Sequence, residues 1–427
     1  IWNLGVSPRL FGGDEAWTAN VSLSYLGEEW GNVFGLAIGG SVPRAFSLLQ
    51  GILINILGPT VFAARLFPAL EGTITIAVFY YLVRLVFADR GVAIGASMFL
   101  AASYFHIHFS KMGIPNIASG LTTSLLYLLL LLGHLRSSPL FFFLAGVSLG
   151  VSQYLSLICR ANLVHLAIFC LIYLSINRKN LKGASVLLGS ALLGFLIAFV
   201  PMFIFWLLNP IEYNGRIRQV SIFSNNWIFD EAINTGRSVW QILWEDQISK
   251  VFLSFNYYHS HAIHLNSHKP YLLFWSSIFF IFGIVASLIN FRRPYAWLGL
   301  TWFFTDLTLG GVLTIDSPQG NRIIGTIGGA SILIACGVYH TCKLMTFNWN
   351  KQIISLLSSL VLFAISFAEI RFYFDEYLPQ NYFGGHATAI AQIIGERFHK
   401  QEDGGKSVVY FPETLGSGSK VIRILTI

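Results

Sequence analysis

The sequence predicts an all-α polytopic membrane protein, and three observations support this fold class. Of the 427 residues, 55% are hydrophobic and only 11% are charged. Soluble domains carry about 25% charged residues, so this composition excludes an ordinary soluble protein. Apolar runs of about 20 residues recur along the chain, which is long enough for a helix to cross a bilayer. The loops between these runs alternate in charge, as expected of a protein with several spans.

Ten apolar segments are the predicted spans: 64–87, 91–107, 114–134, 139–157, 161–177, 183–208, 271–291, 295–314, 323–345 and 351–371. Segment 44–60 is also apolar, but Gly51, Gly58 and Pro59 interrupt it. We therefore expect it to be a helix that lies along the membrane surface. Because the chain begins at Ile1 and ends on VIRILTI, we expect it to be part of a longer protein with an eleventh span upstream.

The loops fall into two sets that alternate strictly along the chain. The first set is rich in basic residues, which predicts the cytoplasmic side; these are Arg84, Arg90, Arg136, Arg178, Lys179, Lys182, Arg292, Arg293, Lys343 and Lys351. The second set is predicted to face outward: 1–63, 106–113, 153–160, 209–270, 315–322 and 372–427. This orientation accounts for the net charge of +7 better than binding to nucleic acid does.

The domain organisation follows from the same pattern. Residues 1–371 are predicted to form the transmembrane domain, with a first outer loop at 1–63 and a large outer loop at 209–270 made of short surface helices. Polarity rises after residue 371, where AIAQIIGERFHK is typical of an amphipathic helix and SVVYF of a strand. We therefore expect 372–427 to begin a small α/β extracytoplasmic domain. The four cysteines have no metal-like spacing, so we interpret them as packing residues.

Two carboxylates stand side by side in the segment FGGDEAW of the first outer loop. Adjacent residues do not share a helix face, so one of Asp14 and Glu15 can face a cavity while the other braces the backbone. A carboxylate in the cavity would serve as the base that deprotonates an acceptor. An exposed, solvated pair is the alternative, and the spacing alone does not decide between the two.

A short outer loop, TIDSPQGNRIIG, carries Asp316, Gln319, Asn321 and Arg322. An arginine at the lipid–water boundary can bind a phosphate group with two parallel hydrogen bonds. The alternative is an arginine that extends from a helix end to reach water. Arg322 is therefore a candidate phosphate ligand.

Histidines gather in two outer segments. His106 and His108 precede Lys111 in YFHIHFSKMG, and Tyr258 and His259 begin YYHSHAIHLNSHK, which also holds His261, His264 and His268. Imidazoles are good zinc ligands, but no carboxylate or thiolate accompanies either group. We favour histidines that are hydrogen bonded and predict no metal site. Within predicted spans, Glu71 and Asp306 are candidates because acids in the membrane are costly.

Four motifs taken together resemble one family of enzymes. FGGDEAWTA, RLFPALEGTITIAVFYYLVRLVF, HIHFSKMGIPN and DSPQGNRIIG occur in this order along the chain. They resemble glycosyltransferase family 39, the protein mannosyltransferase and aminoarabinose transferase-like enzymes of bacterial membranes with the GT-C fold. Each motif alone is weakly specific. The resemblance extends from about residue 8 to the segment FYFDEYLP near the end of the chain.

This resemblance implies a polyprenyl-phosphate sugar as donor, transfer to an acceptor outside the cytoplasm, and inversion at the anomeric carbon. It implies that Asp14 is the base and that Glu15 holds the sugar or the loop. By the same resemblance Arg322, Lys111 and Arg160 would bind the donor phosphate. Several relatives have an aspartate where this chain has Asn116, which weakens any divalent-metal role.

The prediction is therefore a multi-pass glycosyltransferase of the cell inner (plasma) membrane that transfers a hexosyl or pentosyl group and requires no cofactor. The acceptor is a protein, a lipid or a glycan. Remaining site candidates are His106, His108, Asp316, Gln319, Asn321, Tyr258 and His259. A transporter or lipid flippase is the alternative, and it predicts internal repeats and charges at mid-membrane. A noncatalytic scaffold is a third interpretation, which donor binding would distinguish from an enzyme.

Overall fold

The computed structural model describes residues 3–27, 33–37, 40–224, 226–259, 262, 264–346, 350–380, 390, 392 and 393. In this part of the chain the regular structure is almost entirely helical. The exception is a two-stranded antiparallel sheet of β1 (Leu36–Ala37) and β2 (Val42–Pro43), in which Leu36 pairs with Pro43. The predicted all-α class is confirmed for the described residues.

A helix forms in each of the ten segments predicted as spans. These helices are α3 (Val61–Phe87), α4 (Arg90–Ala102), α6 (Ala118–Arg136), α7 (Pro139–Ser152), α8 (Ala161–Ile176), α9 (Leu181–Leu208), α14 (Phe274–Ile289), α15 (Pro294–Leu307), α17 (Thr326–Met345) and α18 (Lys351–Arg371). The polar side chains of Thr60 and Asp89 accept the hydrogen bonds that begin α3 and α4. Such caps satisfy amide groups that a helix leaves unpaired at its start.

The predicted count of ten spans is not confirmed. Six helical segments are long and apolar enough to cross a membrane, or seven if the bent pair of α4 and α5 (Tyr104–Ser110) is one span. Among the others, α7 and α14 have 14 and 16 residues, fewer than the roughly 20 that a perpendicular crossing needs. An apolar run in the sequence also does not show a change of helix type, such as the change from α15 to the π-helical η6 (Thr308–Val312).

The bend between α4 and α5 is 58° and falls at Ser103, which leaves the helical conformation. The buried carboxylate of Glu369 in α18 lies at this break and accepts from the amide of Tyr104 at 3.4 Å. Its other oxygen accepts from the Ser276 hydroxyl at 2.6 Å, near the start of α14. Glu369 thus joins the starts of two helices.

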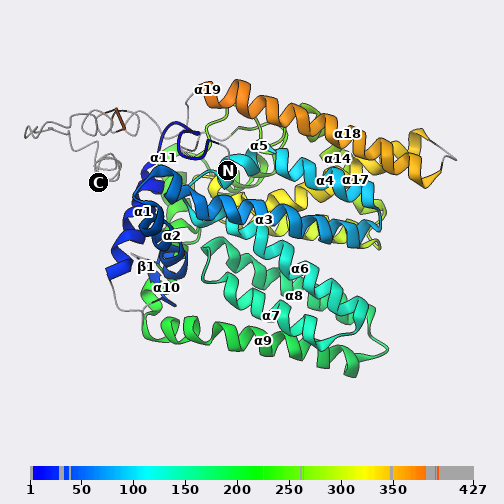
Figure 1. The fold of residues 1–427 in the computed structure, drawn as a ribbon, viewed down its shortest axis with the longest axis horizontal. Coiled ribbons are helices and arrows are strands. Elements are labelled where there is room, and N and C mark those ends of the chain that lie inside the picture. Colours follow the sequence, from blue (N-terminus) through cyan, green and yellow to red (C-terminus); the bar gives the residue numbers. More distant parts are fainter. Residues whose placement is uncertain are drawn as a thin grey trace, which may run out of the picture.

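The long helices run side by side, with α9 at one edge and α18 at the other (Figure 1). The turns that hold the Lys- and Arg-rich loops lie at one end of this bundle. The helices α1 (Gly13–Ser24), α2 (Arg44–Leu57), α10 (Pro210–Val220) and α11 (Trp227–Thr235) gather at the opposite end. The two sets of loops that were separated by charge are therefore also separated in space.

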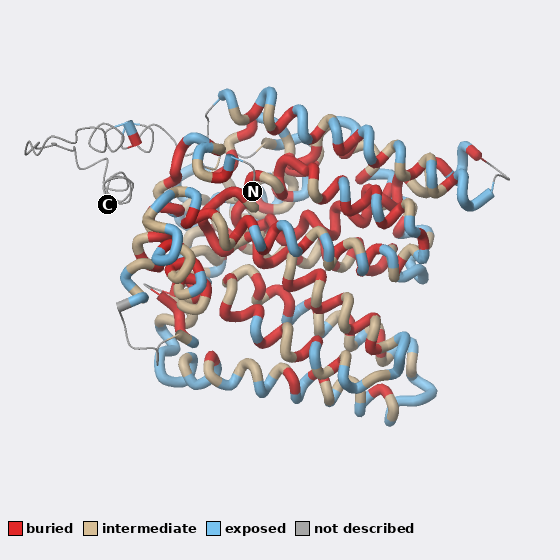
Figure 2. Tube along the Cα trace, in the orientation of Figure 1, coloured by how far each residue is buried: buried red, intermediate tan, exposed pale blue. Residues whose placement is uncertain are grey.

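Buried residues are concentrated in the middle of the bundle, while the outer helices expose apolar side chains (Figure 2). In α9 only 17% of the most apolar window is buried, although its mean hydropathy is 2.6. A helix that is apolar on its exposed faces is suited to contact with lipid. This pattern agrees with a multi-pass membrane protein.

Smaller elements complete the end where α1 and α2 lie. They are η1 (Tyr25–Gly27), η3 (Pro115–Ile117), η4 (Leu157–Arg160), α12 (Val239–Gln241), η5 (Ile242–Ser249), α13 (Lys250–Leu253) and α16 (Gly320–Ile323). Between residues 209 and 253, the region predicted as a large outer loop forms the short helices α10, α11, α12, η5 and α13. Segment 44–60 forms α2, which packs on α1 and α3.

Only the start of the predicted C-terminal piece can be followed. The chain continues α18 through the π-helical η7 (Phe372–Tyr377) into α19 (Leu378–Gln380). Beyond these elements, residues 390, 392 and 393 are described. The side chain of Gln392 contacts the first outer loop, accepting from the Phe11 amide at 3.0 Å and donating to the Arg9 carbonyl at 2.8 Å. The predicted strand SVVYF lies outside the described residues.

Candidate active site

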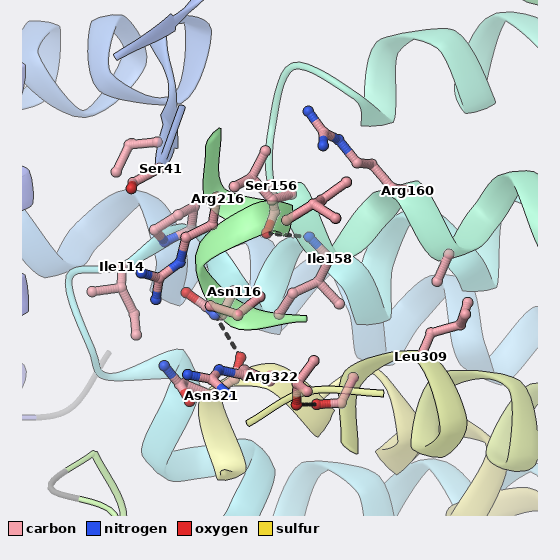
Figure 3. Close-up of a pocket in the computed structure, with 18 of the residues that line it drawn as sticks. Ser41, Ile114, Asn116, Ser156, Ile158, Arg160, Arg216, Leu309, Asn321 and Arg322 are labelled. Carbon is pink, nitrogen blue, oxygen red and sulfur yellow. Dashed lines mark hydrogen bonds between the residues drawn. The ribbon is translucent and has the colours of Figure 1, made fainter. Parts of the chain in front are cut away.

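A cavity of about 730 Å³ lies at the end of the bundle where α1, η4, α10 and η6 meet. Its ionisable lining residues are Asp14, Arg160, Arg216, Asp306 and Arg322. The rest of its wall is largely apolar and includes Ile114, Leu157, Ile158, Val164, Ile217, Leu309 and Leu313. Figure 3 shows Arg216 and Arg322 on either side of Asn116, with Arg160 farther along the cavity. Such a cavity can accept a ligand that has one charged part and one apolar part.

The first turn of α1 separates the two adjacent carboxylates. The side chain of Asp14 is 60% exposed and lines the cavity. Glu15 is fully buried and does not line it. Its Oε2 accepts from the Gly12 amide at 2.9 Å, and its Oε1 accepts from the Gly113 amide at 2.7 Å. Glu15 therefore joins the first outer loop to the second.

Arg65 of α3 is the ionic partner of Glu15. Its Nε donates to Oε1 at 2.8 Å and its Nη2 to Oε2 at 3.0 Å, with both side chains fully buried. The same guanidinium donates to the carbonyls of Leu4, Pro8 and Leu10. Sequence reasoning missed Arg65, although a charged residue near the end of an apolar span was a usable signal. This network fixes the loop that carries Asp14.

Two of the cavity's arginines have guanidinium nitrogens without a hydrogen-bond partner in the described part of the chain. Arg322 donates from Nη1 to the Ile315 carbonyl at 2.5 Å, while its buried Nε has none. Arg160 donates from Nη2 to the Tyr213 carbonyl at 3.0 Å and lies over the Tyr213 ring at 4.1 Å, while its buried Nη1 has none. A buried donor without a partner is costly, so both groups are prepared to bind an acceptor.

Arg216 is a third cavity arginine, and sequence reasoning missed it. A bridge between Ser221 and Thr314 holds the end of α10 against the loop before Arg322. The pKa of Arg322 is lowered from 12.5 to about 10, first by burial and then by the charge of Arg216, with Asp316 opposing the shift. At this value the guanidinium stays charged near neutral pH. The two like charges gain by binding an anion between them.

Lys111 lies outside the cavity lining. It is buried, donates to the Ser7 hydroxyl at 3.4 Å, and lies 5.5 Å from the centre of the Phe374 ring. Burial, and to a smaller extent Arg65, lowers the pKa of Lys111 from 10.5 to about 8. Lys111 therefore lies apart from the cavity lined by Arg160 and Arg322, with which the family resemblance grouped it.

The other sequence candidates divide between cavity and surroundings. Asn321 lines the cavity, and its backbone carbonyl accepts from the Asn116 side chain at 2.5 Å. The remaining candidates do not line it: His106, His108, Tyr258, His259, Asp316 and Gln319. No cluster of three metal-ligating residues occurs within the described ranges. His261 lies outside those ranges.

Asp306 forms part of the cavity wall and has partners that the sequence did not reveal. Its Oδ1 is 2.9 Å from Nε2 of His165, and its Oδ2 accepts from the Trp302 indole at 3.1 Å. Tyr127 contacts the other ring nitrogen of His165 at 3.0 Å. One partner of this buried acid lies in α8 and the other in its own helix α15, and Tyr127 of α6 extends the network through His165. Asp306 thereby helps to join three helices behind the cavity.

Fold and cavity together define a polytopic helical protein with a charged site at one end of its bundle. Residues 41–206 match the family model described as dolichyl-phosphate-mannose-protein mannosyltransferase. No curated protein sequence matches the chain. The fold resembles ArnT from Cupriavidus metallidurans bound to undecaprenyl phosphate, with TM-score 0.52 and 14% identity, covering 100% of this chain and 73% of that one.

The apo state of the same ArnT is similar as well, with TM-score 0.50 and 13% identity over 98% of this chain and 71% of that one. The resemblance to GT-C glycosyltransferases that the sequence predicted is therefore confirmed. At this level of identity the solved structures establish the fold. The matched family segment includes Arg160 and Lys111, whereas Asp14, Arg216 and Arg322 lie outside it.

Proposed function

We propose that the protein is a membrane glycosyltransferase that moves a sugar from a polyprenyl-phosphate donor to an acceptor. The observation that carries this proposal is the single cavity that joins Asp14 to Arg160, Arg216 and Arg322. A transfer of this kind needs a base at one position and cations for a phosphate leaving group at another. The family match over residues 41–206 and the ArnT-like fold support the same reaction.

The arginines supply the phosphate end of the proposed site. Guanidinium groups bind phosphate oxygens with paired hydrogen bonds, and Nε of Arg322 and Nη1 of Arg160 are both without a partner in the described chain. Their charges oppose the negative charge that develops on the leaving phosphate. The apolar residues that continue the cavity wall, among them Val164 and Leu309, suit the start of a polyprenyl chain.

Asp14 supplies the proposed base. The acceptor gives its proton to the Asp14 carboxylate while its oxygen or nitrogen forms a bond to the anomeric carbon. The bond between that carbon and the phosphate oxygen breaks, and its electron pair stays on the polyprenyl phosphate. Attack from the side opposite the phosphate inverts the anomeric centre. We assign Glu15 the role of holding the loop, because its oxygens are occupied by Arg65 and two backbone amides.

We further propose that the cavity faces the extracytoplasmic side of the inner membrane. The Lys- and Arg-rich turns lie at the far end of the bundle, which is the end that the charge rule assigns to the cytoplasm. Whether the sugar is a hexose or a pentose is decided by the pocket wall. The proposed acceptor is a protein, a lipid or a glycan, and the proposed reaction uses no metal.

The first test measures binding of undecaprenyl phosphate to the purified protein. We expect Arg322→Ala to weaken binding by about tenfold or more, because hydrogen bonds between charged groups contribute about 1.5–3 kcal/mol. Arg322→Lys should restore part of the loss, since lysine keeps the charge without the paired geometry. Arg371→Ala is the control, because Arg371 is 67% exposed and does not line the cavity.

The second test supplies polyprenyl-phosphate sugars labelled in the sugar, hexose and pentose separately, with a cell-envelope fraction as acceptor. Wild type should transfer label from one of them, and Asp14→Asn should abolish transfer while retaining lipid binding. Asp375→Asn, a change at a carboxylate whose side chain is 60% exposed, should transfer normally. Full turnover in both Asp14→Asn and Arg322→Ala would show that the assigned roles are wrong.

A further inference from the structure

A histidine from the large outer loop lies against the proposed base. Nε2 of His264 is 2.7 Å from Oδ2 of Asp14, although the two residues are 250 positions apart. The His264 side chain is only 11% exposed, whereas that of Asp14 is 60% exposed. The contact therefore joins a carboxylate in the cavity to a group that belongs to the packed part of the molecule.

The carboxylate determines which ring nitrogen carries the proton. An ionised carboxylate only accepts hydrogen bonds, so Nε2 of His264 must be the donor. Nδ1 of the same ring is buried and has no partner in the described part of the chain. A ring with its only proton on Nε2 fits both contacts. Nε2 then donates to Asp14, and the buried Nδ1 carries no N–H that would need a partner.

Buried residues of the helix bundle hold His264 in position. Its backbone carbonyl lies 2.6 Å from Nε2 of His108, which is fully buried in α5. His108 in turn packs against the rings of Tyr373 and Tyr377. The next residue in the loop, Leu265, is also fully buried. An imidazole anchored in this way gives the exposed Asp14 side chain a partner with a fixed direction.

We propose that His264 is a positioning residue for Asp14, holding its carboxylate in one orientation at the cavity and favouring its ionised form. This inference rests on the proposed function, in which Asp14 is the base. A base must lie within hydrogen-bond reach of the proton that it removes, and a mobile carboxylate meets this condition only part of the time. This role for His264, a buried histidine of the large outer loop, needs no metal.

The proposal makes a distinct statement about pH. A hydrogen bond donated to a carboxylate favours its charged form, so the loss of this donor should move the acid limb of the activity profile to higher pH. The other charged groups that line the same cavity are Arg160, Arg216, Asp306 and Arg322. They remain in place when His264 alone is changed, so the shift can be assigned to the lost donor.

The test compares two replacements of similar size. His264→Gln places an amide donor close to the position of Nε2, whereas His264→Met has no donor. We expect the glutamine variant to keep kcat within about threefold of wild type, and the kcat of the methionine variant to fall by about tenfold or more. The KM for the polyprenyl-phosphate sugar should be unchanged in both variants. The acid limb should move to higher pH in the methionine variant alone. His268→Asn is the control, because His268 is exposed, lies in the same loop, and has a φ of 51° that asparagine tolerates.

Two outcomes would overturn the inference. If both variants match wild type in rate and pH profile, His264 does not position the base. If both lose activity equally and the acid limb stays in place, the role of His264 is only structural. If the wild type and both His264 variants bind undecaprenyl phosphate but none of them transfers sugar, the proposed function is instead refuted.

Discussion

At the scale of single residues, Asp14 and Glu15 show how neighbouring carboxylates come to differ. Glu15 is buried and bonded to Arg65 and two backbone amides, and Asp14 lines the cavity beside His264. Two residues in the first turn of a helix point about 100° apart, so one can face the core when the other faces the cavity. The buried member gives the exposed member a fixed backbone.

The Glu15–Arg65 pair should therefore contribute strongly to stability. Arg65→Ala leaves a buried carboxylate without its cation, and breaking such a pair costs about 3–5 kcal/mol. We expect a large drop in Tm, measured by thermal unfolding in detergent. Arg371→Ala is the comparison, because that arginine pairs with Asp375 at 3.3 Å on an exposed surface and such pairs contribute about 0–1 kcal/mol. Equal losses in the two variants would contradict the assigned role.

Lys111 predicts how stability changes with pH. Its pKa is lowered from 10.5 to about 8 in the folded protein by burial, so the unfolded chain binds the proton more tightly. The charged lysine therefore costs stability below about pH 8, and this cost disappears as pH rises toward 10.5. Lys111→Met should have a Tm advantage over wild type that is largest near pH 7 and smaller near pH 10. The same change at the exposed Lys182 should give a difference that does not vary with pH.

The sequence predicted some of the site's residues and missed others for a physical reason. Asp14 and Arg322 belong to local motifs, and both line the cavity. Arg216 was not singled out, and His264 was noted only as one of four neighbouring histidines, because nothing nearby in the chain indicates their partners. Their positions follow from contacts across long separations, such as the bridge from Ser221 to Thr314. A single sequence contains no direct record of such contacts.

At the scale of helices, close packing depends on glycines at crossing points. A Cβ atom on Gly283 of α14 would lie 1.8 Å from the Leu333 carbonyl of α17, and one on Gly146 of α7 would lie 1.8 Å from the Ala191 carbonyl of α9. Small residues let helix backbones approach closely in membranes, where the hydrophobic effect does not hold helices together. The two close helix pairs thus depend on residues without side chains.

Gly283→Ala should force α14 away from α17. Overpacking in a tight core costs about 1–3 kcal/mol, so we expect a clear drop in Tm. Gly189→Ala, in α9, is a matched control because a Cβ there meets no atom within 4 Å. It should leave Tm unchanged or raise it slightly, since alanine favours helix by up to about 1 kcal/mol. A neutral Gly283→Ala would show that the helices separate without cost.

The positions of the helices were predictable from the apolar pattern, but the number of helices long and apolar enough to cross a membrane was not. Long apolar runs locate the ten helices, because lipid or protein core covers every face of such segments. They do not show where an α-helix changes to a π-helix, as it does from α15 to η6. Nor do they show the bend at Ser103, which Glu369 supports from a helix far away in the chain.

At the scale of the whole molecule, the charge pattern and the arrangement of the bundle agree. The basic turns lie at one end and the cavity elements at the other. In a membrane, this separation predicts that the Ser137 turn faces the cytoplasm and that the 209–270 loop faces outward.

Cysteine labelling tests this orientation in a background where Cys170, the least buried cysteine, is serine. A cysteine at Arg218, in the large outer loop, should react with an impermeant maleimide in intact cells. A cysteine at Ser137, which is exposed in the turn after α6, should react only after the membrane is opened. The reverse pattern would place the cavity on the cytoplasmic side and exclude the proposed extracytoplasmic reaction.

The cavity wall also has a consequence for synthesis of the protein. Its residues come from the first helix of the described chain and from α16, after most of the helices have been made. A nascent chain that has inserted only its first half carries Asp14 and Arg160 but lacks Arg216 and Arg322. The site is therefore incomplete until α16 has been synthesised, and chemistry at this site has to wait until most of the bundle has been made.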